Sequence, residues 1–192
     1  MKDEYITISE NKEPYHKVLT SDKVINIAGG TGSGKTTYCE KYRDDNNYIL
    51  IDTDQIKDDR LADNLNEALL KEYLFNKYHT KELDIVNDFE RIYQDILDYY
   101  KDKSRNKTLV IDSAQFSSIK DISILKGEII IIRTSVDECF NRCIERFKKN
   151  KIFYEEAELE KYKERKKGMY EWYKKYNELI EKLEEVKNGI HK

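Results

Sequence analysis

Four of the seven glycines in this chain lie within eight residues, 29–36, which read GGTGSGKT. This segment fits the phosphate-binding pattern G-x-x-x-x-G-K-[ST], in which glycines let successive backbone N–H groups approach phosphate oxygens. An apolar run, Val24–Ala28, precedes it and predicts a buried strand, and residues 37–42 after it predict the start of a helix. Because a strand, a glycine-rich turn and a helix are the setting that the pattern requires, we expect the segment to bind the phosphates of a nucleotide.

Two side chains extend this expected site beyond the backbone. The Lys35 ammonium is expected to reach the outer phosphates, and the Thr36 hydroxyl can ligate magnesium. The chain lacks the Asn-Lys-x-Asp motif of guanine-specific proteins, so ATP with Mg²⁺ is the expected cofactor pair. The expected nucleotide-binding residues of the segment are Gly30, Thr31, Gly32, Ser33, Gly34, Lys35, Thr36 and Thr37.

Apolar runs alternate with helical patterns along the chain, which indicates a parallel sheet with crossover helices. Four runs are short, β-branched and nearly continuous, as expected for strands that are buried on both faces. They are Val24–Ala28, Tyr48–Ile51, Thr108–Ile111 and Glu128–Ile132, and Tyr5–Ile8 is a candidate for a further strand. We therefore expect the 192 residues to form a single α/β domain, similar to the three-layer sandwich of P-loop NTPases with its central parallel sheet.

The segment 57–106, between the second and third predicted strands, contains two helical patterns. The first apolar stripe is Leu61, Leu65, Ala68, Leu69 and Leu74, and the second is Val86, Phe89, Ile92, Tyr93, Ile96, Leu97 and Tyr100. Both stripes recur at spacings of three and four residues, as on one face of a helix. The segment is longer than a plain crossover needs, so it is either a substrate-binding insertion or two more packing helices.

Two helices are expected after the fourth predicted strand. One runs from Val136 to about Lys149 with Ser135 as its N-cap, and the other from about Glu155 to Lys187. The second helix carries an apolar stripe that predicts a docking face: Met169, Trp172, Tyr176, Leu179, Ile180, Leu183 and Val186.

Three arginines near the end of the fourth predicted strand are candidates for binding phosphate. Arg142 and Arg146 are four residues apart and share one helix face, within a segment, 142–155, that is expected to act as a lid. Guanidinium groups there would stabilise the charge of a transferring phosphoryl group. The alternative is a surface helix whose arginines pair with neighbouring acids. Arg133, directly after the strand, is a candidate for contact with adenine or phosphate.

Three acids follow predicted strands, and the carboxyl ends of parallel strands face the ligand crevice. Asp112 directly follows the apolar run Thr108–Ile111, and in phosphate-loop enzymes the magnesium-binding acid likewise follows an apolar strand. A turn residue would give the same pattern. Asp52 and Asp54 follow the second strand, where one carboxylate could face magnesium and the other an acceptor hydroxyl. The expected metal ligands are thus Thr36, Asp52 and Asp112, and the alternative for the Asp52 and Asp54 pair is an Asx turn.

Composition excludes several classes of function. The net charge is −3 and the 38% of charged residues are of mixed sign, so no nucleic-acid partner is expected. No run is long and apolar enough to span a membrane and no secretory signal is visible, so a cytoplasmic location is expected. Three cysteines give no disulfide framework, and a zinc site is not expected because no histidine lies near Cys139 and Cys143.

Together these motifs resemble small-molecule kinases of the phosphate-loop class. The stretch Asp52-Thr53-Asp54-Gln55-Ile56 is similar to the acid-x-acid motif of shikimate kinases and to the corresponding acids of zeta-toxin kinases. That resemblance implies magnesium contact at Asp52 and acceptor binding or proton abstraction at Asp54. The strand and helix around 131–146 are similar to the arginine-bearing lid region of deoxynucleoside kinases. The chain lacks the glycine cluster of shikimate kinases and the Asp-Arg-Ser motif of deoxynucleoside kinases. The resemblance therefore extends to the kinase class and not to either family.

The leading hypothesis is therefore an ATP- and Mg²⁺-dependent phosphotransferase that acts on a small-molecule hydroxyl or phosphate. Its expected catalytic residues are Lys35, Asp52, Asp54, Arg142 and Arg146. One alternative is a nucleotide-dependent regulatory switch, and another is a zeta-toxin-like nucleotide-sugar kinase. The identity of the acceptor and the oligomeric state are left open.

Overall fold

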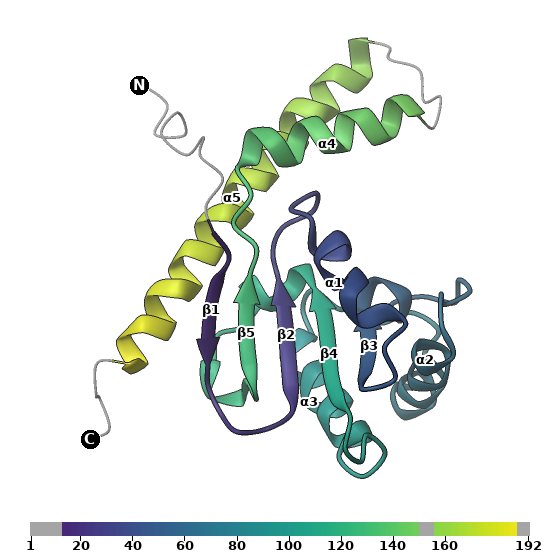
Figure 1. Cartoon of the computed structure of the whole chain (residues 1–192). Coiled ribbons are helices and arrows are strands. Elements are labelled where there is room, and N and C mark those ends of the chain that lie inside the picture. The colour runs from purple at the N-terminus through teal and green to yellow at the C-terminus, as the bar shows by residue number, and fades with distance from the viewer. Residues whose placement is uncertain (1–12, 150–155, 188–192) are drawn as a thin grey trace.

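The computed structural model describes residues 13–149 and 156–187, and its centre is one five-stranded sheet. The order of the strands is β1 (Tyr15–Val18), β5 (Glu128–Ile131), β2 (Val24–Ala28), β4 (Thr108–Ser113) and β3 (Tyr48–Asp52). β2 to β5 are parallel, and β1 runs antiparallel to β5 at one edge (Figure 1). The predicted α/β fold with a central, mostly parallel sheet is confirmed.

The helices cover both faces of this sheet. α1 (Lys35–Arg43) packs through Cys39 and Tyr42 on one face. The other face is covered by α3 (Phe89–Tyr100) and α5 (Glu156–Lys187), whose apolar residues join the larger core cluster. The remaining helices are α2 (Leu65–Tyr78), α4 (Val136–Lys149) and the 3-10 turns η2 (Thr53–Gln55), η3 (Ala114–Ser118) and η4 (Ile122–Ile124). The result is the expected three-layer arrangement.

The predicted strands are all present, with small shifts at their ends. β3 continues to Asp52 and β4 to Ser113, so Asp52 and Asp112 lie within strands and Asp54 in the turn η2, while β5 ends at Ile131. β1 was not predicted, because its side chains alternate between half-buried and exposed positions and give little apolar signal. The candidate strand Tyr5–Ile8 lies outside the described residues.

The first predicted stripe of the segment 57–106 is wrong at three of its five positions, while Leu74 is buried as expected and Ala68 is half-buried. Leu61, Leu65 and Leu69 are 94%, 72% and 46% exposed, and the helix begins at Leu65. The face that packs inward carries Leu70 and Leu74 together with the polar residues Glu67 and Lys71. Leucines recur on both faces of this helix, so spacing alone could not select the inner one.

The second predicted stripe corresponds to the buried face of α3, except for Val86, which precedes the helix and is 55% exposed. Phe89, Ile92, Tyr93, Ile96 and Tyr100 are all buried there. Phe89 and Tyr93 also pack edge-on against Phe116 of η3, which ties this helix to the end of β4.

α4 and α5 form a hairpin that extends beyond the carboxyl ends of β2, β4 and β5 (Figure 1). An ion pair between Lys166 and Asp137, with 2.8 Å between Nζ and Oδ1, links the two helices. The later part of α5 returns to the core, where Leu179 and Leu183 are buried. The hairpin therefore connects the core to the edge of the sheet at which the parallel strands end.

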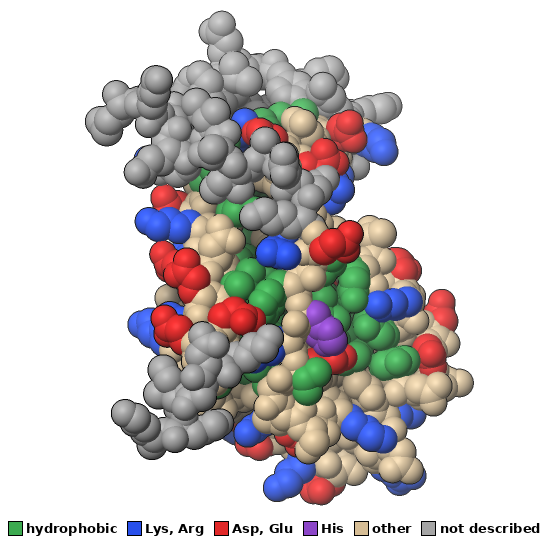
Figure 2. Space-filling model, turned by 60° about the vertical axis from the view of Figure 1, so that its left-hand side comes forward, with side chains coloured by type: hydrophobic (Ala, Val, Ile, Leu, Met, Phe, Trp, Pro, Cys, Tyr) green, Lys and Arg blue, Asp and Glu red, His purple; other side chains and the backbone are tan. Residues whose placement is uncertain are grey.

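Charged side chains of both signs are interspersed over the molecular face in Figure 2, with hydrophobic side chains exposed between them. No helix in the described part of the chain is long and apolar enough to cross a membrane.

Candidate functional site

Residues 29–36, here called the phosphate loop, join β2 to α1 through left-handed backbone conformations. The φ angles of Gly32 and Gly34 are 78° and 101°, values that glycine adopts without strain. α1 begins at Lys35 without a side-chain cap and without an acid in its first turn. Its first N–H groups and the positive end of its dipole are therefore available to an anion.

The side chains of the phosphate loop divide into exposed and buried groups. Thr36 and Thr37 are exposed beside the first turn of α1. The Lys35 ammonium donates to the Gly30 carbonyl at 3.0 Å, so it lies folded against the loop. Ser33 is only 3% exposed, and its hydroxyl has no hydrogen-bond partner in the described residues. The loop thus presents backbone N–H groups, Lys35 and two threonines on its outer side.

The predicted acids Asp52 and Asp112 lie side by side at the carboxyl ends of β3 and β4. They are register partners in the parallel pair, so their side chains leave the sheet on the same face, which is the face covered by α1. Asp112 is 4% exposed and lies near the Cys39 thiol of α1. Burial, assisted by the charge of Asp52, raises the pKa of Asp112 to about 7.

Besides lying next to Asp112, Asp52 has a structural role. Its side chain accepts from the Asp54 N–H at 2.9 Å and so caps η2, which is the Asx turn considered as the alternative. Burial raises the pKa of Asp52, although the hydrogen bond from the Asp54 N–H acts in the opposite direction. The Asp54 side chain is 67% exposed, and its Oδ1 lies 3.7 Å from the Lys57 ammonium. The structure therefore separates the two acids, one at the strand end and one in solvent.

A cavity of about 270 Å³ opens beside Thr36 and the two strand ends. It is bounded by α1, β3, the start of α2 and the end of β4. Its lining residues are Thr36, Cys39, Arg43, Asp44, Tyr48, Leu50, Asp52, Asp63, Asn64, Asn66, Glu67 and Asp112. This cavity lies next to the phosphate loop and is open to solvent on the side of its exposed residues.

Glu67 is a residue of this cavity that sequence reasoning missed. It is 2% exposed, and its Oε2 accepts from the Asp52 N–H at 2.7 Å, which joins α2 to the end of β3. Burial, followed by the charge of Asp52, raises its pKa to about 7, although the N–H of Asp52 acts in the opposite direction. Asn64 caps α2 by accepting from the Glu67 N–H at 2.8 Å. An Asn-x-x-Glu pattern at a helix start was the available signal, but it predicts a capping box within α2 and not a contact with β3.

Residues 150–155 of the expected lid lie outside the described residues, and its two arginines take different positions. Arg142 lies against the phosphate loop, with its Nη1 donating to the Gly32 carbonyl at 3.2 Å and its Nε to Glu138 at 3.0 Å. Arg146 is exposed one turn later and lines a separate cavity of about 520 Å³ with Thr31, Cys143, Arg165, Gly168, Met169 and Trp172. Only Arg142 contacts the loop directly.

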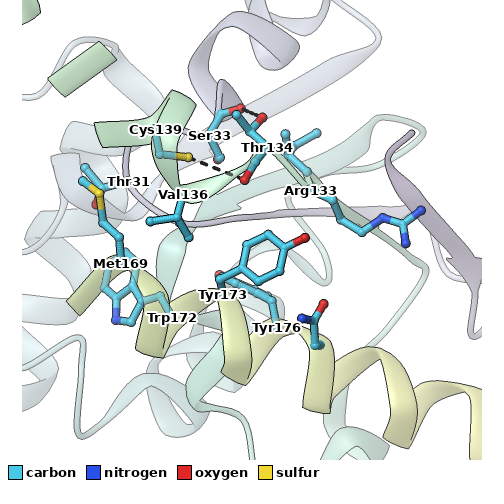
Figure 3. Close-up of a pocket in the computed structure, with 13 residues that line it drawn as sticks. Thr31, Ser33, Arg133, Thr134, Val136, Cys139, Met169, Trp172, Tyr173 and Tyr176 are labelled. Carbon is cyan, nitrogen blue, oxygen red and sulfur yellow. Dashed lines mark hydrogen bonds between the residues drawn. The ribbon is translucent and has the colours of Figure 1, made fainter. Parts of the chain in front are cut away.

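Arg133 points away from the loop. Its Nε and Nη2 donate to the Glu13 carbonyl at 2.9 and 2.7 Å. Figure 3 shows its guanidinium directed outward from the hollow between the phosphate loop, the residues after β5 and helix α5. The Thr134 hydroxyl in the same segment instead donates to the Ser33 carbonyl at 2.6 Å, which fixes the loop to the start of α4.

Two aromatic residues of α5 also contact the site and were predicted only as parts of a docking face. A Cβ on Gly30 would lie 3.4 Å from the indole of Trp172, so the ring packs on the loop (Figure 3). The Tyr176 hydroxyl donates to the Ala114 carbonyl, directly after β4. α5 therefore touches both the phosphate loop and the strand end that carries Asp112.

The residues present fit a nucleotide-bound magnesium ion. Within residues 13–149 and 156–187 there is no group of three or more His, Cys, Asp and Glu side chains arranged to hold a metal. Magnesium in nucleotide sites needs only one or two carboxylates, because phosphates and water complete its shell. The buried Asp112 and the half-buried Asp52, whose pKa values are both raised, lie near the exposed Thr36 and provide such a partial shell.

The strand, the phosphate loop, the uncapped helix and the flanking acids define a P-loop nucleotide-binding domain. Residues 21–136, more than half of the chain, match the family described as AAA domain, and the chain belongs to this family. No curated protein sequence matches the chain with significant similarity. The family match ends at the first residue of α4, so the α4 and α5 hairpin lies outside it.

Proposed function

We propose that this nucleotide-binding domain is a phosphotransferase that moves the γ-phosphate of ATP to a small-molecule hydroxyl or phosphate. The observation that carries the proposal is the cavity beside Thr36, Asp52 and Asp112. Hydrolysis requires space for a water molecule only, whereas transfer requires a second binding site next to the γ-phosphate. The cavity is of a size that admits a small acceptor.

Each side chain has a distinct task in this proposal. The loop N–H groups and Lys35 bind the phosphates, and Thr36 with Asp112 would hold magnesium. When bound, magnesium supplies charge neutralisation at the phosphate oxygens. Arg142, which already lies on the loop, and Arg146 stabilise the charge of the transferring group and exclude water.

Asp52 is the carboxylate that we assign to the acceptor. The acceptor hydroxyl forms the new O–P bond, its proton passes to Asp52, the bond to the β,γ-bridging oxygen breaks, and ADP leaves with that electron pair. Asp54 was the other candidate, but it is exposed and does not line the cavity. Asp52 lines the cavity beside Thr36 and therefore fits the task better.

Label transfer from γ-labelled ATP tests this proposal. The full chain is incubated with Mg²⁺, the labelled ATP and a pool of small metabolites, and the products are separated. Label on a small molecule, lost in Lys35→Ala, is the expected result. Release of labelled phosphate alone, at one rate with and without the pool, would overturn it.

A second candidate is a regulatory module in which nucleotide binding or slow hydrolysis orders the loops. The AAA family match favours this candidate, since it covers the nucleotide-binding core but not the hairpin that carries Arg142. The same experiment separates the two candidates, because a switch hydrolyses ATP at a rate that no acceptor changes.

A further inference from the structure

Helix α2 lies beside β3 at one edge of the molecule and carries an exposed apolar row, Leu65, Leu69 and Tyr73, here called the α2 stripe (Figure 1). These three side chains are 72%, 46% and 37% exposed, and Leu61, four residues before the first of them, is 94% exposed. Together they are four of the seven large hydrophobic side chains that are exposed in the described part of the chain. A single exposed leucine is ordinary, but a row of neighbours on one helix face indicates an interaction surface.

A hollow of about 350 Å³ lies along one side of the α2 stripe, between α2, β3 and the turn from α3 to β4. Its apolar residues are Ile49, Leu69, Tyr99 and Tyr100, so Leu69 belongs to both the stripe and the hollow. The rings of Tyr99 and Tyr73 are in contact, with 4.8 Å between their centroids. The stripe and the hollow therefore form one continuous surface that is apolar and partly concave.

The rim of this hollow is basic. It carries the exposed residues Lys103, Arg105 and Lys107, and the lining contains no carboxylate. None of these three cations forms an ion pair with a residue that the structure describes, and the Lys103 ammonium lies over the Tyr99 ring at 4.2 Å from its centroid. Cations without acidic partners beside an apolar floor favour an occupant that brings both apolar side chains and carboxylates.

The other side of the α2 stripe differs in charge. Asn66, which lines the hollow, and Glu72, which is exposed, lie three residues before and after Leu69, so they flank the stripe on opposite sides. Asp63, two residues before Leu65, is also exposed. An anionic membrane surface would be repelled by these acids, and a second copy paired through this surface by a twofold axis would bring the two basic rims to the same side of the contact. A helix that carries acids along one side of its apolar face matches both sides of the stripe.

We propose that the α2 stripe and its hollow bind an amphipathic helix of another protein, whose carboxylates lie at Lys103, Arg105 and Lys107. Rows of residues four apart form ridges that pack into the grooves of a second helix, which is the packing that the stripe offers. On its inner face the same helix α2 holds Glu67, which accepts from the Asp52 N–H, so the partner lies one helix away from the end of β3. This inference does not depend on the proposed phosphotransferase function.

Three fluorescently labelled helical peptides on one alanine-rich frame test this chemistry. The first carries leucines at a spacing of four with glutamates beside them, the second has lysines in place of the glutamates, and the third keeps the glutamates but has serines in place of the leucines. Fluorescence anisotropy measures the binding of each peptide to the full chain. We expect the glutamate peptide to bind at least about tenfold more tightly than the lysine peptide, and the leucine-free peptide not to bind. No binding of the glutamate peptide, or equal affinities for it and the lysine peptide, would overturn the inference.

Variants of the chain locate the binding on this surface. Leu69→Gln, at a partly exposed position, should weaken binding of the glutamate peptide at least about fivefold. The matched control is Val186→Gln on α5, which is 47% exposed and should bind as the wild type does. Lys103→Gln together with Lys107→Gln should reduce the preference for the glutamate peptide over the lysine peptide at least about threefold, whereas Lys41→Gln on α1 should keep it. Unchanged binding in Leu69→Gln, or an equal loss in Val186→Gln, would overturn the inference.

Two further measurements address other occupants of the surface. Sedimentation velocity detects self-association of the chain, and flotation with vesicles of phosphatidylserine and phosphatidylcholine detects membrane binding. We expect neither to depend on Leu69. Self-association or flotation that Leu69→Gln abolishes and Val186→Gln retains would assign the surface to a second copy or to a membrane, and would overturn the inference.

Discussion

At the scale of single residues, Lys35 is the group whose loss should most directly weaken nucleotide binding. Its ammonium now donates to a loop carbonyl and must exchange this contact for phosphate oxygens. A charge-assisted hydrogen bond contributes about 1.5–3 kcal/mol, so Lys35→Ala should lower the affinity for Mg-ATP roughly 10- to 100-fold. Calorimetric titration measures this, and Lys41→Ala, at an exposed position of the same helix, is the control.

Asp52 and Asp54 make a matched pair of variants. A positioned general base contributes about 10²–10⁴-fold to a rate, so Asp52→Asn should slow label transfer by at least about 100-fold. Asp54→Asn removes an exposed carboxylate and should change the rate little. The measurement is initial-rate label transfer at saturating ATP. A large loss in Asp54→Asn with a small one in Asp52→Asn would reverse the assignment.

The raised pKa of Glu67 makes a prediction for stability against pH. Because its pKa is about 7 in the folded chain and lower when unfolded, the folded state binds more protons between these values. Its contribution to stability is therefore present at low pH and is lost as pH rises through about 7. Glu67→Gln should gain stability relative to wild type between pH 5 and pH 8, by up to about 3 kcal/mol. Urea denaturation of the nucleotide-free chains at both pH values measures this, and a gain that falls with pH would contradict it.

At the scale of elements, the strands were predictable and some helix faces were not. β2 and β4 are continuous apolar runs because both of their faces are covered, and this property is local to the sequence. β1 depends on pairing with β5, more than a hundred residues away, and its own residues alternate weakly. α2 buries Glu67 and Lys71 while Leu65 faces solvent, so the tertiary contacts of the helix override its apolar pattern.

Helix α5 offers a matched test of its docking face. Leu183 is fully buried in the core, whereas Val186, one turn later on the same helix, is 47% exposed. Leu183→Ala should destabilise the chain by about 2–5 kcal/mol, because it removes buried methyl groups and leaves a cavity. Val186→Ala should cost under about 0.5 kcal/mol. Chemical denaturation followed by circular dichroism gives both values, and equal losses would show that α5 is not docked as described.

At the scale of the whole molecule, the site joins parts of the chain that are far apart in sequence. The loop and the strand-end acids were predictable because each follows its own strand. Three other side chains of the site could not be predicted, because each reaches it from a helix whose angle is set by packing. They are Glu67, Cys39 and Tyr176. The sequence predicted which strand ends carry the loop and the acids, but not which helices pack around them.

The single tryptophan reports on this assembly. Trp172 packs on Gly30 of the phosphate loop, and the chain contains no other tryptophan. Binding of Mg-ATP at the loop should change the environment of the indole and hence its emission maximum or intensity. A fluorescence titration measures the change, and Lys35→Ala should lose it at the same nucleotide concentration. Emission that is unaffected while calorimetry detects binding would show that the loop and α5 are not coupled.

The path of α5 has a consequence for how such a protein could have evolved. Leu179 and Leu183 fill the core while Trp172 and Tyr176 contact the loop and the end of β4, yet the family match stops before this helix. A segment that is needed both for the interior and for the nucleotide site cannot be gained or shed as a separate appendage. Descendants of this chain should therefore inherit this part of the helix together with the sheet.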